Sequence, residues 1–160
     1  MRTRCLFSPA SGAGSLLVAA ALSPCIAVAQ KAPPGAAPRE EQAAFQAVCG
    51  SCHPTSMIAD FRSGADWSET IGQMISYGAQ ATDEQFKLVW RYLLRTLTRV
   101  NVNSAAASEL APVLDISEAA AEALVKRRND KGNFKSLEEL KKVPGVDAAK
   151  LEARKDRVVF

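Results

Sequence analysis

Histidine is nearly absent from this sequence of 160 residues, which holds only His53, and aromatic residues make up just 6% of the chain. So few aromatic side chains argue against two protein cores of conventional size, and a domain of about 60 residues is marginally stable on its own side chains. An excess of charge is also lacking, because the formal net charge is +3 and includes Arg2 and Arg4 at the N-terminus. This balance gives no support to a general attraction for nucleic acid or anionic membranes.

The first 29 residues predict an export signal. Arg2 and Arg4 precede the apolar run Ser15–Leu22, which is too short to span a bilayer, and Ala27-Val28-Ala29 has the small-x-small pattern of a leader peptidase site. We therefore expect a signal peptide at residues 1–29, cleaved after Ala29, and a periplasmic mature protein with no stable membrane span. An uncleaved membrane anchor is the alternative, and it requires the apolar run to continue through a serine, a proline and a cysteine.

Cysteine is scarce as well, since two of the four cysteines, Cys5 and Cys25, lie in the predicted leader. The remaining pair, Cys49 and Cys52, is followed directly by His53, and the C-x-x-C-H spacing is typical of c-type haem attachment. Each thiol can add to one vinyl group of the porphyrin while the adjacent imidazole reaches the iron. The motif predicts one covalent haem c per chain, with Cys49 and Cys52 as thioethers and His53 as the proximal iron ligand.

Two other interpretations of the C-x-x-C pair have less support. A thioredoxin-like redox pair belongs in a βαβ surround, whereas the residues before Cys49 have a helical pattern. A zinc site needs four ligands, and the mature chain would keep only Cys49, Cys52 and His53 as thiol or imidazole donors.

The sixth iron ligand is predicted among the methionines, because the chain has no second histidine. Met57 follows His53 by only four residues, so we expect it to stay on the proximal side of the ring, which leaves Met74 as the distal ligand. Met74 shares one helical face with Trp67 and Ile71, and this face should meet the haem. Core packing is the ordinary role of a methionine at such spacing, but elimination favours ligation here.

Three helices are expected around the haem motif, after a linker rich in proline and alanine at residues 30–40. The first, from Glu41 to about Val48, carries an inward aromatic residue and leads into the motif. The second runs from Asp66 as N-cap to Tyr77, and Gly78 closes it. The third opens at the capping box Thr82-Asp83-Glu84-Gln85.

This order of helices and motif resembles the class I cytochromes c over residues 41–99. The resemblance implies a small all-α cytochrome c fold with His53 and Met74 as axial ligands, and haem attachment outside the cytoplasmic membrane. It also implies an electron carrier, not an enzyme, that passes single electrons between redox partner proteins.

The last 60 residues predict two helical hairpins. The turns fall at Leu114-Asp115-Ile116 and Val143-Pro144-Gly145-Val146, and Ser117 and Ser136 are the N-caps of the helices after the first turn and before the second. With Gly132-x-Phe134 between the hairpins, this order resembles the helix-hairpin-helix domain of the bacterial competence DNA-receptor family over residues 100–160. The resemblance implies a four-helix, double helix-hairpin-helix fold.

In that family, glycine-flanked turns present backbone N–H groups to a DNA phosphate. The first turn here has no glycine, Asp147 follows the second, and residues 100–160 carry eleven basic and ten acidic residues. We therefore expect the domain to be an adaptor for another protein, with nucleic acid a disfavoured partner. Two alternatives stay open, a DNA-binding or DNA-uptake protein with auxiliary haem, and a haem enzyme or sensor with an open sixth position.

Overall fold

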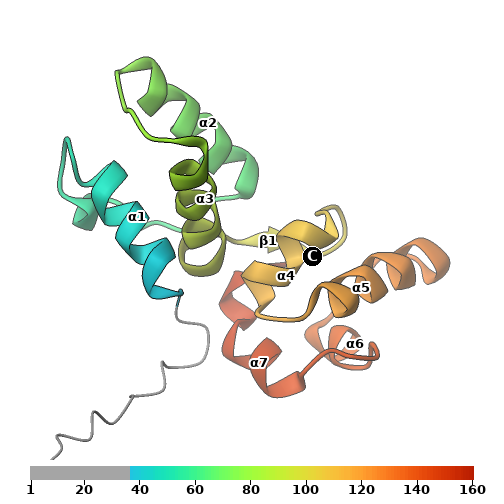
Figure 1. Ribbon diagram of the computed structural model, residues 1–160. Helices are drawn as coiled ribbons and strands as arrows, with labels where there is room; N and C mark the ends of the chain where they lie inside the picture. Colours follow the sequence, from blue (N-terminus) through green and yellow to red (C-terminus); the bar gives the residue numbers. More distant parts are fainter. Residues whose placement is uncertain (1–36) are drawn as a thin grey trace, which may run out of the picture. The chain divides into compact units, whose positions relative to one another are not determined.

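The computed structural model describes residues 37–160, and Ala32–Phe160 belongs to one compact unit (Figure 1). The predicted signal peptide at 1–29 and most of the predicted linker lie outside the described residues. Seven α-helices and two short strands follow one another in this part of the chain. They are α1 Arg39–Cys49, α2 Gly64–Ser76, α3 Asp83–Leu97, β1 Val100–Asn101, α4 Ala107–Leu114, α5 Glu118–Lys131, α6 Leu137–Lys141, α7 Ala148–Ala153 and β2 Val158–Val159.

The helix starts follow local capping chemistry. The Thr82 hydroxyl accepts from the Gln85 N–H at 3.2 Å and the Gln85 side chain accepts from the Thr82 N–H at 2.9 Å, which confirms the capping box at α3. α2 begins earlier than expected, because Ser63 is its N-cap and Asp66 is the third helical residue of a second capping box. The expectation of Asp66 as N-cap is therefore wrong, since its carboxylate reaches back to the Ser63 N–H instead.

The N-terminal helices bury a small core, which we call the N-terminal core. α1 packs against α3, where the rings of Phe45 and Tyr92 stack with their centroids 4.3 Å apart. The Trp67 indole of α2 is buried and donates to the Leu97 carbonyl at the end of α3 at 2.9 Å. The buried members of this core are Ala44, Phe45, Val48, Trp67, Val89 and Leu93.

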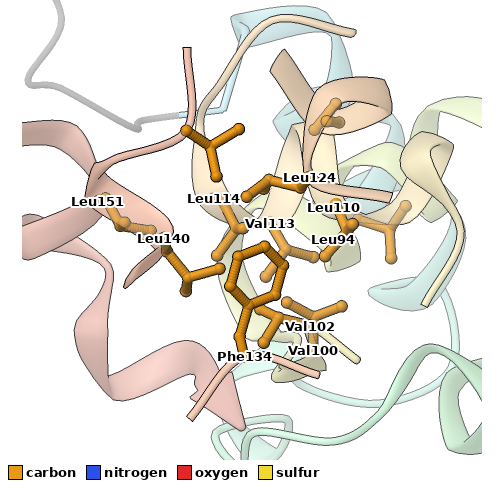
Figure 2. Packing of buried hydrophobic residues seen from close by; sticks show 13 residues of the cluster. Leu94, Val100, Val102, Leu110, Val113, Leu114, Leu124, Phe134, Leu140 and Leu151 are labelled. Atoms are coloured by element: carbon orange, nitrogen blue, oxygen red, sulfur yellow. The ribbon is translucent and has the colours of Figure 1, made fainter. Parts of the chain in front are cut away.

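The C-terminal helices bury a larger cluster, the C-terminal core, which Figure 2 shows from close by. α4 packs against α3 and α5, and the ring of Phe134 lies among side chains from these helices and from β1. The labelled members of this core are Leu94, Val100, Val102, Leu110, Val113, Leu114, Leu124, Phe134, Leu140 and Leu151. The expectation of a mostly helical protein is confirmed.

A small parallel sheet departs from the all-α prediction. β1 and β2 pair in parallel, with Val100 opposite Val158, so the chain's last residues lie beside the segment that follows α3. The Arg157 guanidinium donates to the Leu94 carbonyl at 3.4 Å and to the Arg95 carbonyl at 2.5 Å, and thereby satisfies acceptors at the C-terminal end of α3. Within residues 37–160, no helix combines the length and the apolar character needed to cross a bilayer.

Candidate cofactor pocket and helical hairpins

A pocket of about 450 Å³ opens beside the N-terminal core. The motif residues Cys49, Cys52 and His53 line it together with Met74 of α2, as do apolar side chains of α1, α2 and α3. The apolar residues include Phe45, Val48, Trp67, Ile71, Phe86 and Leu93. All four residues predicted to hold the haem therefore reach the same pocket, and the helical face with Trp67 and Ile71 meets it.

The end of α1 positions the motif. Cys49 is the last helical residue, and Gly50 caps the helix by donating its N–H to the Gln46 carbonyl at 3.1 Å. A β-carbon at Gly50 would collide with that carbonyl oxygen, so the close turn requires glycine. The Ser51 hydroxyl then donates to the Val48 carbonyl at 2.8 Å, which holds the turn toward the pocket.

The cysteines and the histidine are chemically suited to haem c. Cys49 and Cys52 are free thiols, and burial raises the pKa of the Cys49 thiol, which disfavours the thiolate of a redox pair. The His53 Nδ1 atom is buried and has no hydrogen-bond partner among the described residues. A buried imidazole nitrogen without a partner is costly. The surroundings of His53 therefore fit a cofactor that binds in this pocket.

Two methionines reach the pocket rather than one. Met57 lines it beside Met74, although the sequence argument placed Met57 out of reach of the distal side. Met57 is 75% exposed, whereas Met74 is half-buried. Met74 is thus the more enclosed of the two thioethers.

The first helical hairpin makes its turn without glycine. Asp115 adopts the left-handed conformation, with φ 55° and ψ 43°, and the following Ile116 N–H donates to the Ala111 carbonyl at 3.1 Å. Aspartate tolerates this conformation better than most residues. Its carboxylate also pairs with the Lys150 ammonium at 3.3 Å, which ties the turn to α7.

The second hairpin keeps the expected glycine. Gly145 has φ 85°, a conformation that favours glycine, and its Cα faces Ala120 of α5. The Asp147 carboxylate caps α7 by accepting from the N–H groups of Ala149 and Lys150. Both predicted turns are therefore present, and both turn acids interact with groups of the chain itself.

Comparison with known proteins agrees with this geometry. Residues 96–159 match the family model described as the helix-hairpin-helix motif. Residues 96–159 form a helix-hairpin-helix domain. An uncharacterized protein of Haemophilus influenzae strain Rd is 41% identical over 63 residues, which are 39% of this chain. The match spans 56% of that relative's length. No solved structure matches the chain.

The primary functional prediction, an electron-carrying cytochrome with a protein-docking adaptor, is wrong. The family that the comparison recognises is helix-hairpin-helix, which is typical of DNA-binding and DNA-uptake proteins, and not cytochrome c. The described part of the chain also has no cluster of three or more His, Cys, Asp or Glu side chains suited to a metal ion. The low net charge was a poor basis for excluding DNA, because the summed charge of a domain does not show where on its surface the charged side chains lie. The helix-hairpin-helix match gives better support to the alternative of a DNA-binding or DNA-uptake protein, and the auxiliary haem of that alternative stays a prediction.

Proposed function

We propose that this chain is an exported DNA-binding protein whose helix-hairpin-helix domain contacts the phosphate backbone and whose N-terminal helices hold one auxiliary haem c. The observation that carries the proposal is the helix-hairpin-helix match over residues 96–159, together with two formed hairpin turns in that range. Contacts to phosphates carry no base information, so we expect binding with little dependence on DNA sequence.

The turn acids are partly neutralised by groups of the chain itself. Asp115 and Asp147 would repel a phosphate if they faced it without partners. Instead Asp115 pairs with the Lys150 ammonium, and Asp147 accepts two N–H groups at the start of α7. These interactions offset part of each negative charge. Because Asp147 occupies the Ala149 and Lys150 N–H groups, a phosphate at the second turn would be held by other N–H groups or by cationic side chains.

The pocket supports the auxiliary haem. A porphyrin supplies an apolar surface and an iron that an imidazole can ligate. Cys49 and Cys52 would hold it covalently, His53 would be the proximal ligand, and Met74 the distal one. The apolar lining would exclude water from the group, and haem would thereby complete the small cytochrome-like N-terminal core.

A DNA titration tests the main proposal. The full chain is titrated into a fluorescent duplex, and anisotropy is followed at several salt concentrations. We expect binding at about 10 µM protein or below in low salt, which weakens steeply as salt rises, because phosphate contacts release counterions. Absence of binding at low salt, or binding that salt does not change, would overturn the proposal.

The haem proposal has its own test. The chain is produced with the machinery for c-type haem attachment, and its intact mass and absorption spectrum are measured. We expect the mass of one covalent haem, which the Cys49→Ala/Cys52→Ala variant loses and the Cys5→Ala/Cys25→Ala variant keeps. A colourless protein with the mass of the bare chain would overturn this part and leave the DNA proposal standing.

A further inference from the structure

A second hollow lies in the helix-hairpin-helix domain, away from the haem motif in sequence. This groove of about 570 Å³ is formed by the C-terminal half of α5 and by the segment from α6 to the Val143-Pro144 turn. Its charged lining comprises the cations Lys126, Arg127, Lys131 and Lys142 and the acids Asp130 and Glu139. The groove is thus more basic than the domain as a whole.

The two acids of the groove are already engaged. The Asp130 carboxylate pairs with the Lys126 ammonium at 3.0 Å. The Glu139 carboxylate accepts from the Lys135 backbone N–H at 3.1 Å, next to the start of α6. Neither acid pairs with Arg127, Lys131 or Lys142.

The other three cations are available to an anion. Lys131 and Lys142 are exposed and form no ion pair with any residue in the described part of the chain. The Arg127 guanidinium lies 5.1 Å from the centroid of the Phe134 ring and donates to the Gly132 carbonyl at 3.3 Å. Arg127 is therefore held at the groove, while Lys131 and Lys142, which both follow it in sequence, provide exposed ammonium groups without an ion-pair partner among the described residues.

We infer that this groove binds the phosphate backbone of DNA, as a contact additional to the hairpin turns. The inference rests on the proposed function, because the helix-hairpin-helix match is what favours nucleic acid over another polyanion. A planar guanidinium and flexible ammonium groups together suit phosphate oxygens. The exposed Pro144 at the edge of the groove offers an apolar surface to the deoxyribose.

The test compares two double variants of the full chain with equal change in charge. Lys131→Ala/Lys142→Ala removes the two unpaired groove lysines. Lys87→Ala/Lys155→Ala is the control, since these lysines pair with Glu84 and Glu152 elsewhere on the surface. Circular dichroism and thermal unfolding establish that both variants keep the fold, because cations in the last turn also stabilise a helix.

DNA affinity is then measured by anisotropy over a range of salt concentrations. We expect the groove variant to bind about ten- to a hundredfold more weakly than wild type, with a salt slope smaller by about 2, since each phosphate contact contributes about 0.9 to the slope. The control should change affinity by less than about threefold, because its lysines would make no phosphate contact.

The outcomes separate the two proposals. Wild type that fails to bind DNA would overturn the proposed function and this inference with it. Wild type that binds while both double variants lose affinity equally would overturn the groove alone and leave the hairpin turns as the DNA contact. If polyglutamate competes as well as DNA does at equal charge, the groove is a general anion site and its assignment to nucleic acid is overturned.

Discussion

The two cores of this chain differ in how complete they are. The C-terminal core consists of 13 buried residues that close around Phe134, and its helices need no added group to cover them. The N-terminal core has six buried residues and borders a 450 Å³ pocket lined by two thiols, an imidazole and two thioethers. One region is thus closed by its own side chains, whereas the other leaves an open pocket beside a small core. α3 contributes to both, because Leu93 belongs to the N-terminal core and Leu94 to the C-terminal one.

The largest effect is expected in the C-terminal core. Phe134→Ala removes a ring that is 1% exposed and should lower the free energy of unfolding by about 3–5 kcal/mol, whether or not haem is attached. Denaturant unfolding followed by circular dichroism measures the change. Phe160→Ala is the matched control, because that ring is 45% exposed. A loss of less than about 1 kcal/mol for Phe134→Ala would contradict the view of a closed, fully packed core.

The next effect tests the connection between the cores. Arg157→Ala removes a donor to the Leu94 carbonyl and one of the two donors to the Arg95 carbonyl, which keeps its bond from Arg154. It should lower the free energy of unfolding by about 2 kcal/mol, since two hydrogen bonds from a largely buried guanidinium are lost. Burial lowers the pKa of Arg157 to about 10, which marks how far this guanidinium is desolvated. Thermal unfolding measures the loss. Lys155→Ala, a change at a 59% exposed side chain, should cost less than about 0.5 kcal/mol, and equal losses would refute the connection.

Loss of a helix N-cap should lower the free energy of unfolding by a similar amount in the two regions. Thr82→Ala at α3 and Ser117→Ala at α5 each remove an N-cap hydroxyl, and each should cost about 1 kcal/mol. The costs should match because capping is local and does not depend on how well a core is filled. Denaturant unfolding compares the two variants with Thr82→Ser and Ser117→Thr, which keep the capping oxygen. A cost in one helix only would show that capping depends on the surrounding core.

The smallest effect concerns pH. Glu109 of α4 accepts a hydrogen bond from the Gly64 N–H at the start of α2, and partial burial raises its pKa. The Glu109 carboxyl group therefore stays protonated to higher pH in the folded state than in the unfolded state. As pH rises from the unfolded-state pKa through the folded-state pKa, the contribution of Glu109 to the free energy of unfolding falls. Glu109→Gln should remove that part of the pH dependence, and the exposed Glu118→Gln should keep it. Thermal unfolding at several pH values measures the difference. If stability depended on pH identically in the wild type and the Glu109→Gln variant, the assignment of this pH dependence to Glu109 would be contradicted.

Local signals predicted much of this structure. The capping box at Thr82, the serine caps at Ser117 and Ser136 and both hairpin turns can be located from neighbouring residues alone, because caps and turns depend on a few adjacent positions. The C-x-x-C-H motif is local in the same way, and its residues Cys49, Cys52 and His53 line one pocket.

Long-range features could not be predicted in this way. The parallel pair of Val100 and Val158 joins two-residue strands 58 positions apart, too short to produce an alternating pattern. Glu41 reads as a surface residue of a helix, yet it is buried and pairs with Arg95 of α3 at 3.2 Å. The basic groove was missed for a related reason, because Lys142 meets the α5 cations of the groove only in the folded chain, and the near-zero net charge of the domain gives no sign of this grouping.

Hydrogen exchange of the full chain with and without duplex DNA tests the central claim most directly, because it reports the two regions separately in one experiment. The account predicts slower amide exchange in the helix-hairpin-helix domain on DNA binding, greatest near the Val143–Val146 turn, with α1 and α2 unchanged. Protection confined to α1 and α2, or no protection anywhere at a DNA concentration that saturates the anisotropy signal, would contradict it.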